Sequence, residues 1–375
     1  METALLPTFA PWSDYEHRAA LLLERLRSGD PVASGWFREL HPRFRRADVP
    51  WLPRATTDAD VPPDVGLDDA LLVVARAHAF LDASSLSAWV AAVSEAGSAT
   101  ARFERAVDHR VDGDLAVLGS LLASDPELVH ARSGRVCCFD PPVHRAMLLH
   151  YVAANGVENH RQRTPPNAVD VATALLRAGA DPDAEADLYG GRWTPASLLV
   201  SSGPPAEAGL QVPLLEVLAA FGATLEGSEH PPLLTALTFG MSEAAEALVR
   251  LGVGIHDLPT AAGLGRLDRA RALLPTADPA ARHLALALAA QLGQADAVRL
   301  LLDAGEDPDR YDPAGAHAHA TPLHQAALHG HETVVRLLVE RGAALDLRDR
   351  IWDATPEGWA RHGGHLAIAD RLRSP

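Results

Sequence analysis

The chain has 375 residues, of which 47% are hydrophobic, and its 33 basic and 49 acidic residues leave a net charge of −16. A surface of that sign repels phosphate backbones and anionic lipids, so we expect neither nucleic acid nor a membrane as a partner. No charge-free apolar run reaches the roughly 18 residues that a membrane span needs, and the N-terminus lacks the basic-then-apolar order of a signal peptide.

Two features of the composition bear on source and compartment. Every basic residue is Arg, and Ile and Asn are scarce, which we interpret as the mark of a GC-rich bacterial genome. The two cysteines, Cys137 and Cys138, are adjacent and cannot cross-link distant parts of the chain, which is typical of a reducing compartment. We therefore expect a cytoplasmic protein.

Residues 1–97 form the first predicted domain. Helical periodicity covers residues 15–28, 32–40, 67–81 and 85–93, and the Pro- and Asp-rich residues 45–66 are predicted to be a loop. Four of the seven tryptophans lie here, Trp12, Trp36, Trp51 and Trp89. We expect them to form the core of a helical cap, with an aromatic docking surface as the alternative.

The second predicted domain, residues 98–375, carries a repeated pattern that begins at residue 103. Glycines predicted to lie in turns between two helices occur at positions 113, 156, 240, 265, 293, 330 and 364, and a further one is placed at Gly203. A second series, at positions 179, 222, 252, 305 and 342, follows the second helix of each pair. Glycine suits both places because it adopts positive φ without steric cost. The two series predict eight helix-turn-helix repeats over residues 103–373.

The most regular repeat, residues 321–349, reads TPLHQAALHGHETVVRLLVERGAALDLRD. Thr321 is a favourable N-cap, and Pro322 occupies the first helical position, where its missing N–H costs nothing. The first helix is expected to end before the turn at Gly330, and the second at Gly342. Helices this short cannot bury both apolar faces alone, so we expect them to stack on neighbouring repeats.

This repeat resembles the ankyrin repeat, whose TPLHxA signature it contains, and residues 147–156, MLLHYVAANG, match it position for position. The resemblance implies an all-α solenoid, here with an N-terminal helical cap. It also implies that His324 and its counterpart His150 hydrogen-bond neighbouring backbone, and that Gly156 and Gly179 end the two helices of the His150 repeat. The pattern is similar to a group of long bacterial ankyrin-repeat proteins without an assigned activity.

The resemblance further implies a binding surface. In ankyrin repeats the two residues before the turn glycine lie on the concave face, next to residues of the fingers that join the repeats. The corresponding positions, which we predict to bind a partner protein, are Thr238, Phe239, Leu264, Gln291, Leu292, Leu328, His329, Ile351, Trp352 and His362. Their apolar members would form a stripe of the kind that marks interfaces. The alternative is that irregular repeats turn Phe239 and Leu264 into the core.

Histidines supply an alternative function. Four of them have no structural role in the family pattern, whereas His331 and His365 occupy its turn position; the four are His317, His319, His329 and His362. A zinc site would need three or four ligands converging at about 2 Å from the metal. We predict no metal site, and keep one built from these histidines as the alternative.

Signatures of catalysis are missing from the sequence. It contains no GxSxG, HExxH, P-loop or GxGxxG pattern, and Cys137, between Val136 and Cys138, is expected to be packed and not nucleophilic. We therefore predict a non-enzymatic interaction scaffold without a cofactor. An enzyme or metal-binding protein that uses the histidines, or a pocket between residues 1–97 and the repeats, is the alternative.

Two insertions, residues 157–167 and 202–211, interrupt adjacent repeats. We expect surface loops there, with a second recognition site as the alternative. The sequence identifies neither the partner nor the biological process. It leaves the oligomeric state open and favours a monomer.

Overall fold

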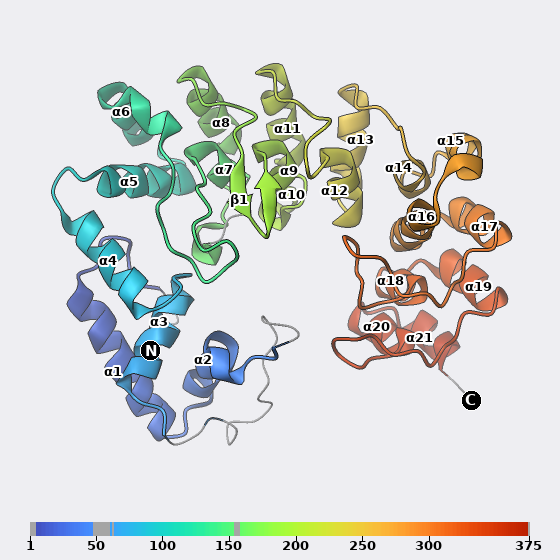
Figure 1. The fold of residues 1–375 in the computed structure, drawn as a ribbon, viewed down its shortest axis with the longest axis horizontal. Coiled ribbons are helices and arrows are strands. Elements are labelled where there is room, and N and C mark those ends of the chain that lie inside the picture. The colour runs from blue at the N-terminus through green and yellow to red at the C-terminus, as the bar shows by residue number, and fades with distance from the viewer. Residues whose placement is uncertain (1–4, 48–60, 62–63, 154–157, 374–375) are drawn as a thin grey trace. The chain divides into compact units, whose positions relative to one another are not determined.

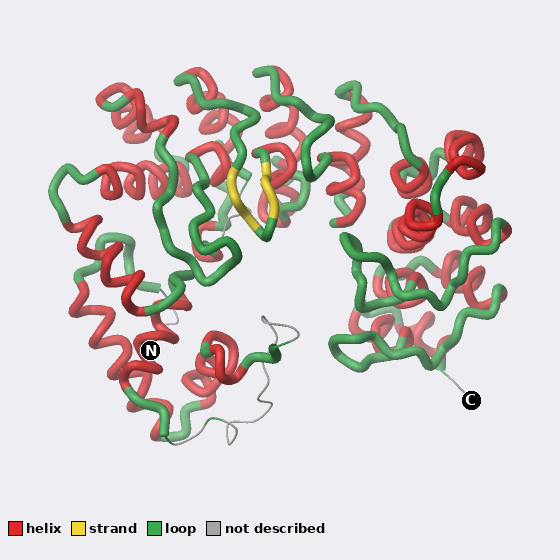
Figure 2. The backbone as a smooth tube through the Cα atoms, viewed as in Figure 1, coloured by secondary structure: helices red, strands yellow, loops and turns green. Residues whose placement is uncertain are grey.

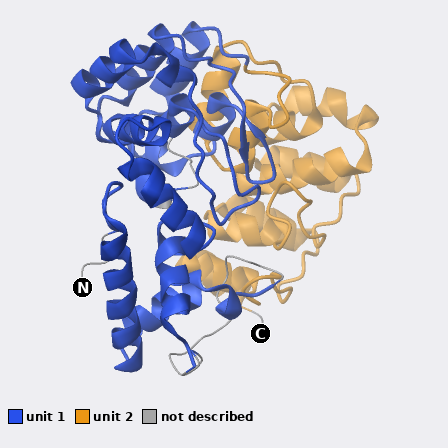
Figure 3. Cartoon of the chain, turned by 60° about the vertical axis from the view of Figure 1, so that its left-hand side comes forward, with its two compact units in different colours: residues 1–224 blue, residues 225–375 orange. Residues whose placement is uncertain are grey.

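The computed structural model describes residues 5–47, 61, 64–153 and 158–373 (Figure 1). The chain divides into two compact units, residues 1–224 and residues 225–375, which Figure 3 distinguishes by colour. This division falls inside the repeat array, and the predicted domain boundary near residue 97 stays a prediction. Among the described residues, no helix is both long and apolar enough to cross a membrane.

The N-terminal part of unit 1 consists of four helices and one 3-10 turn. They are α1 (Trp12–Arg27), α2 (Pro31–Leu40), η1 (Pro42–Phe44), α3 (Leu67–Ala77) and α4 (Ala83–Ser94), close to the four predicted periodic segments. A shared core contains Tyr15, Phe37 and Trp89, and the half-buried Trp12 and Trp36 pack against it. Three tryptophans are thus core residues, and Trp51 lies outside the described residues.

The rest of unit 1 holds three helix pairs whose first helices pack on one another in chain order. The pairs are α5 (Ala99–Asp112) with α6 (Leu115–Ser124), α7 (Leu148–Val152) with α8 (Ala168–Arg177), and α9 (Pro195–Leu199) with α11 (Gln211–Ala220). Short elements lie between them: η3 (Pro126–His130), η4 (Asn159–Arg161), α10 (Gly203–Glu207) and an antiparallel hairpin of β1 (Ala186–Leu188) and β2 (Gly191–Trp193). Figure 2 shows the hairpin in yellow; the sequence did not predict it.

Unit 2 consists of five further pairs. They are α12 (Pro232–Thr238) with α13 (Ser242–Arg250), α14 (Leu258–Gly263) with α15 (Leu267–Leu273) and η5 (Leu274–Thr276), α16 (Pro279–Gln291) with α17 (Ala295–Asp303), α18 (Pro322–Leu328) with α19 (Glu332–Glu340), and α20 (Pro356–His362) with α21 (Leu366–Leu372). The first helices of successive pairs pack on one another and enclose a core of small and aliphatic side chains. The described chain therefore holds eight helix pairs, as predicted, and the predicted all-α array is confirmed.

The glycine series marks the helix ends in most repeats. Five exit glycines, 179, 222, 252, 305 and 342, and six turn glycines, 113, 240, 265, 293, 330 and 364, have positive φ. The prediction for Gly203 is wrong, because it begins α10 and its φ is not positive; the short helix α10 ends instead at Gly209, whose φ is +68°. Gly156 lies outside the described residues.

Side chains of one repeat fill the space beside the turn glycine of the repeat before it. A methyl group on Gly330 would collide with the ring of His365, and one on Gly293 would lie 2.6 Å from His331 Nδ1. His331 also donates from Nε2 to the carbonyl of Gln291, at 2.8 Å. The turn histidines therefore join successive repeats, and they need glycine opposite them.

His324 and His150 both hydrogen-bond backbone, as the resemblance implies. The N–H of Thr321 donates to Nδ1 of His324 at 3.2 Å, and Nε2 donates to the carbonyl of Ala354 at 3.2 Å. His150 repeats this arrangement with Met147 N–H and the Trp193 carbonyl, at 3.2 and 3.3 Å. Each histidine thus ties the start of its own helix to the backbone just ahead of the next repeat's first helix.

The two insertions are anchored in unit 1 and are not surface loops throughout. In the described residues 158–167, Glu158 and Arg161 are buried, with 0% and 3% exposure. In residues 202–211, Gln211 is buried and donates to the carbonyl of Leu199 at 2.9 Å. The expectation of surface loops is therefore wrong at these residues, because their polar groups bond within the unit.

Candidate functional site

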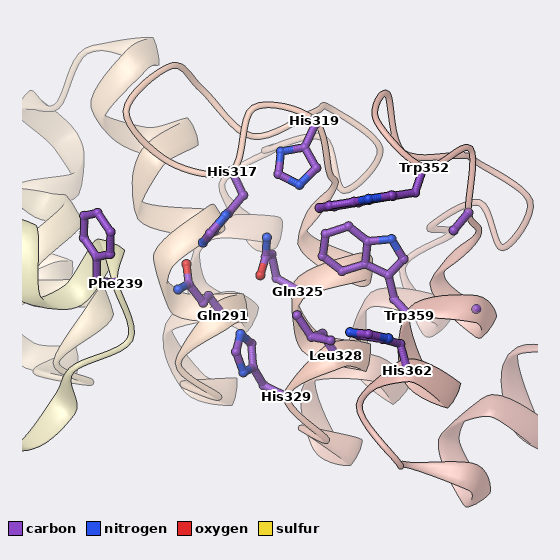
Figure 4. A pocket seen from close by; sticks show the side chains of 12 residues that line it. Phe239, Gln291, His317, His319, Gln325, Leu328, His329, Trp352, Trp359 and His362 are labelled. Atoms are coloured by element: carbon purple, nitrogen blue, oxygen red, sulfur yellow. The ribbon is translucent and has the colours of Figure 1, made fainter. Parts of the chain in front are cut away.

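A cavity of about 670 Å³ lies within unit 2 (Figure 4). Its walls come from the C-terminal ends of α12 and α16, from α18 and α20, and from two fingers that precede α18 and α20. The lining residues are mostly apolar or aromatic: Phe239, Gln291, His317, His319, Gln325, Leu328, His329, Trp352, Ala354, Gly358, Trp359 and His362. In Figure 4, Phe239 stands at one side, the tryptophans at the other, and Gln325 between them.

Six of the ten predicted binding positions line this cavity: Phe239, Gln291, Leu328, His329, Trp352 and His362. Trp352 and Phe239 are 52% and 51% exposed, which is unusual for large apolar side chains. The four histidines considered for a metal site line the same cavity. Residues far apart in the sequence are thus brought together in one apolar site.

The other four predicted positions are not lining residues of this cavity: Thr238, Leu264, Leu292 and Ile351. The prediction that Leu264 offers surface to a partner is wrong, because it is 7% exposed. Repeats pack closely at this point, since a methyl group on Gly263 would lie 3.2 Å from Leu237 and 3.3 Å from Leu292. The core alternative therefore applies to Leu264 and not to the exposed Phe239.

Sequence reasoning missed two lining residues, Gln325 and Trp359. Each lies three positions before a predicted one, Gln325 before Leu328 and Trp359 before His362, on the same helix. Residues three apart share a helix face. Extending each predicted pair by one helical turn would have found both.

The Asp349 carboxylate holds the two tryptophans in place. Its Oδ1 accepts the backbone N–H groups of Ile351 and Trp352 at 2.8 and 2.7 Å, and its Oδ2 accepts those of Ala354 at 2.9 Å and of the Trp359 indole at 3.0 Å. Burial raises the pKa of Asp349, but these hydrogen bonds outweigh burial and leave the pKa lowered. The carboxylate therefore stays ionised and shapes the turn that carries Trp352.

The aromatic rings form a continuous cluster behind the cavity wall. The Trp352 and Trp359 rings meet edge to face with centroids 5.9 Å apart, and His319 lies 5.3 Å from Trp352 and 5.7 Å from Trp359. His324 supports Trp359 from within the fold, with a centroid distance of 5.3 Å. Edge-to-face contacts of this kind are favourable, so the wall is pre-formed.

The described residues that line the cavity include no Asp, Glu, Lys or Arg. Burial lowers the pKa of three lining histidines, His317, His319 and His329. The repulsion of neighbouring histidines lowers the pKa of His317 and His329 further, whereas Asp349 raises that of His319 in part. These rings are therefore neutral at pH 7, and with them the wall that they form.

Two glutamine amides differ in how they are satisfied. Gln291 Nε2 donates to the Thr238 carbonyl at 2.9 Å, which joins α16 to the end of α12. Gln325 is 1% exposed, and neither its Nε2 nor its Oε1 has a hydrogen-bond partner within the described residues. A buried polar atom without a partner costs about 1–3 kcal/mol. Gln325 is thus the one polar group of the cavity wall that the fold leaves unsatisfied among the described residues.

The lining histidines do not form a metal site. Among the described residues, the group with three potential ligand atoms within 4.8 Å of one another is Cys137, His144 and Glu158, in unit 1. None of the four histidines belongs to it. The metal-binding alternative built on these histidines therefore has no support from their geometry.

The Cys137 group does not fit a metal either. His144 Nδ1 accepts the N–H of Ala146 at 3.1 Å, so its proton is on Nε2, which donates to Glu158 at 3.3 Å. The Arg135 guanidinium lies 3.6 Å from the same carboxylate oxygen, where it already supplies positive charge. Burial raises the pKa of the Cys137 thiol, which favours the protonated form over the thiolate that metals and nucleophilic catalysis need.

These groups belong to a buried ionic network that fills the junction between the N-terminal helices and the first repeats. Glu104 accepts hydrogen bonds from Trp89 Nε1 at 3.2 Å, Arg135 Nε at 3.4 Å and Arg161 Nη1 at 2.5 Å. Arg135 in turn lies over the rings of Phe80 and Trp89, 4.6 and 4.4 Å from their centroids. Because these charges are paired, the junction is better explained as an interior contact than as a catalytic pocket.

Stacked helix pairs with turn and exit glycines, and an apolar pocket on their first helices, define a repeat protein with a ligand-sized surface cavity. The family description "Ankyrin repeats (3 copies)" matches residues 258–349. Cyclin-dependent kinase 4 inhibitor B of Homo sapiens is 33% identical to this chain over 138 residues, which are 36% of this chain and 97% of that protein. The chain belongs to the ankyrin-repeat family.

Two further comparisons accompany this assignment. Cyclin-dependent kinase inhibitor 2A of Homo sapiens is 34% identical over 122 residues, which are 31% of this chain and 75% of that protein. The crystal structure of the human ASB11 ankyrin repeat domain is 21% identical and matches with a TM-score of 0.37, covering 72% of this chain and 98% of that one.

Proposed function

We propose that this protein is a non-enzymatic interaction module that binds a partner protein through the unit 2 cavity. The observation that carries the proposal is the pre-formed apolar wall on which Trp352 and Phe239 stand about half exposed. Large aromatic side chains held in a rigid setting are the usual anchors of protein interfaces. Two relatives are named as inhibitors of cyclin-dependent kinases, which are themselves proteins.

The chemistry of the cavity favours binding over catalysis. Its lining offers neutral histidines and amides, with no carboxylate, arginine or cysteine among the described lining residues. General acid–base or nucleophilic catalysis needs such groups close to one another and suitably charged. Binding of an uncharged surface needs only shape and apolar area. We also propose that the protein acts in the cytoplasm, where its free cysteines stay reduced; cell fractionation tests this.

A capture experiment with matched variants tests the proposal. Leu328→Arg places a charge in the cavity wall, and Leu366→Arg places the same charge at a 58% exposed position of α21 outside the cavity. Both variants must first melt like the wild type. We expect a protein from the source lysate to bind the wild type and Leu366→Arg but not Leu328→Arg. Equal capture by all three proteins would contradict the proposal.

A further inference from the structure

The unit 2 cavity constrains the chemistry of its occupant, and an inference about that occupant rests on the proposed function. An arginine, lysine, aspartate or glutamate side chain entering it would lose its hydration without meeting an opposite charge. The nearest fixed charge named above, Asp349, already accepts four hydrogen bonds and is 3% exposed. The anchor that enters must therefore be uncharged.

The shape of the wall favours a flat anchor. Trp352 and Trp359 stand edge to face, with His319 against both, so the cavity presents ring faces and ring edges. An aromatic side chain can add a further offset or edge-on contact to such a cluster, in addition to its large apolar area. The volume of about 670 Å³ is within the range of roughly 300–1,000 Å³ that holds a drug-sized ligand, so it also admits backbone on either side of an anchor.

The Gln325 amide supplies the second, independent observation. It carries one donor group and one acceptor, it lines the cavity, and neither atom has a partner within the described residues. In an extended strand, the N–H and C=O of one residue point to the same side, so a single carboxamide can bond both. Both amide atoms are out of contact with water in the free protein, so the occupant reaches them only when lining side chains move apart. His329 is exposed and Leu328 half-buried, which leaves them room to change rotamer.

We propose that the cavity binds an extended peptide segment of the partner protein, with one uncharged aromatic side chain inserted against Trp352 and Trp359. The Gln325 amide bonds the backbone N–H and C=O next to that side chain. This arrangement satisfies the one unpaired polar group of the wall and matches an uncharged anchor to an uncharged lining. It commits the site to a peptide rather than to a free nucleoside, although an adenine ring could also pair with a carboxamide.

The test uses peptide libraries of nine residues with blocked termini, in which the central residue is fixed and the others are mixed. Binding to the full chain is measured for centres of Trp, Tyr, Phe, Leu, Arg, Lys, Asp and Glu, and for free adenosine. We expect the aromatic centres to bind at least about tenfold more tightly than the charged ones. Tighter binding of a charged centre, or binding of adenosine alone, would overturn the inference.

Variants separate a binding role of Gln325 from a structural one. Gln325→Leu removes an amide that makes no bond in the free protein, so it should melt at or above the wild-type temperature and still lose at least about tenfold in peptide affinity. Leu366→Arg, away from the cavity, should bind the peptides like the wild type. A Gln325→Leu protein that binds peptides normally would sink the assigned contact, and one that unfolds would give Gln325 a structural role instead.

Failure of this inference is distinguishable from failure of the proposed function. If no peptide class binds, yet capture of the partner from lysate still depends on Leu328, the partner uses the cavity by a folded surface and the peptide inference is wrong. If capture is indifferent to Leu328→Arg, the proposed function itself is wrong.

Discussion

Asp349 illustrates how one buried side chain organises a binding wall. Its two oxygens accept four N–H donors, two of them from Trp352 and Trp359. Asp349→Ala leaves these donors without an acceptor, and we expect it to lower the free energy of unfolding by more than about 2 kcal/mol. The control is Asp303→Ala, which breaks an exposed pair with Arg341 and should cost less than about 1 kcal/mol. Urea unfolding of both variants measures the difference; similar losses would mean that the four bonds contribute little.

At the scale of residues, the sequence predicted positions better than exposures. Phe239 and Leu264 both immediately precede a turn glycine, yet the first is half exposed and the second is buried. The difference comes from the approach of Leu237 and Leu292 around Gly263, which depends on the spacing of three helices and has no local signal. Gln325 was overlooked because its importance lies in the absence of a partner, which only the packed structure reveals.

At the scale of elements, the turn glycines predict a graded response to substitution. Gly330 and Gly342 have φ of +75° and +87°, so alanine at either position costs about 1–2 kcal/mol in backbone strain. A methyl group on Gly330 also meets the His365 ring, whereas nothing lies within 4 Å of one on Gly342. We therefore expect Gly330→Ala to lower the melting temperature clearly more than Gly342→Ala. Equal losses would show that His365 yields without cost.

A second pair of substitutions tests the orientation of the α18–α19 repeat. Leu337 on α19 is 3% exposed in the unit 2 core, so Leu337→Ala should cost about 2–5 kcal/mol. Leu328 on α18 lines the cavity and is half-buried, so Leu328→Ala should change stability little. Chemical denaturation measures both. A loss below about 0.5 kcal/mol for Leu337→Ala, the usual surface value, would mean that the buried face of α19 is misplaced.

Helices were more predictable than the segments that join them. Periodicity, Thr-Pro starts such as Thr321-Pro322 and exit glycines such as Gly342 are local signals, and they led to helices close to those observed. The β1–β2 hairpin and the helix α10 were not predicted, because both lie in long connections whose conformation depends on contacts with other repeats. The same reason explains the error at Gly203, which had been assigned to a turn by spacing alone.

At the scale of the whole molecule, buried histidines predict a loss of stability in acid. Burial lowers the pKa of His78 to about 3 and that of His150 to about 4, below the roughly 6.5 of an unfolded chain. The unfolded state therefore binds more protons, and stability present above about pH 6.5 is lost as the pH falls towards about 4. We expect each histidine to add up to about 1.4 kcal/mol per pH unit to this slope.

Calorimetry between pH 4 and pH 7.5 measures the slope, and a substitution supplies its control. His78 contacts the edge of Tyr15, with ring centroids 5.2 Å apart, and His78→Phe keeps an aromatic ring there without a titrating group. This variant should lose about one histidine's share of the acid slope. An unchanged slope would show that His78 is solvated in solution.

The ionic junction of unit 1 marks a limit of prediction at this scale. Glu104 and Arg161 are 57 positions apart and both buried, and each reads as an ordinary charged residue in the sequence. Their pairing follows from how the N-terminal helices meet the first repeats, so the sequence suggested a surface insertion where the fold has an interior contact. The family and the repeat count were predictable because they rest on local patterns repeated along the chain.

The central claim is that a partner protein occupies the unit 2 cavity, and site-specific photocrosslinking tests it most directly. A photoreactive phenylalanine analogue is placed at Phe239, which lines the cavity and is half exposed, or at Leu366, which is exposed outside it. After irradiation in source lysate, we expect a covalent adduct with one partner protein from position 239 and none from position 366. Adducts from position 366 alone, or equal adducts from both positions, would contradict this account.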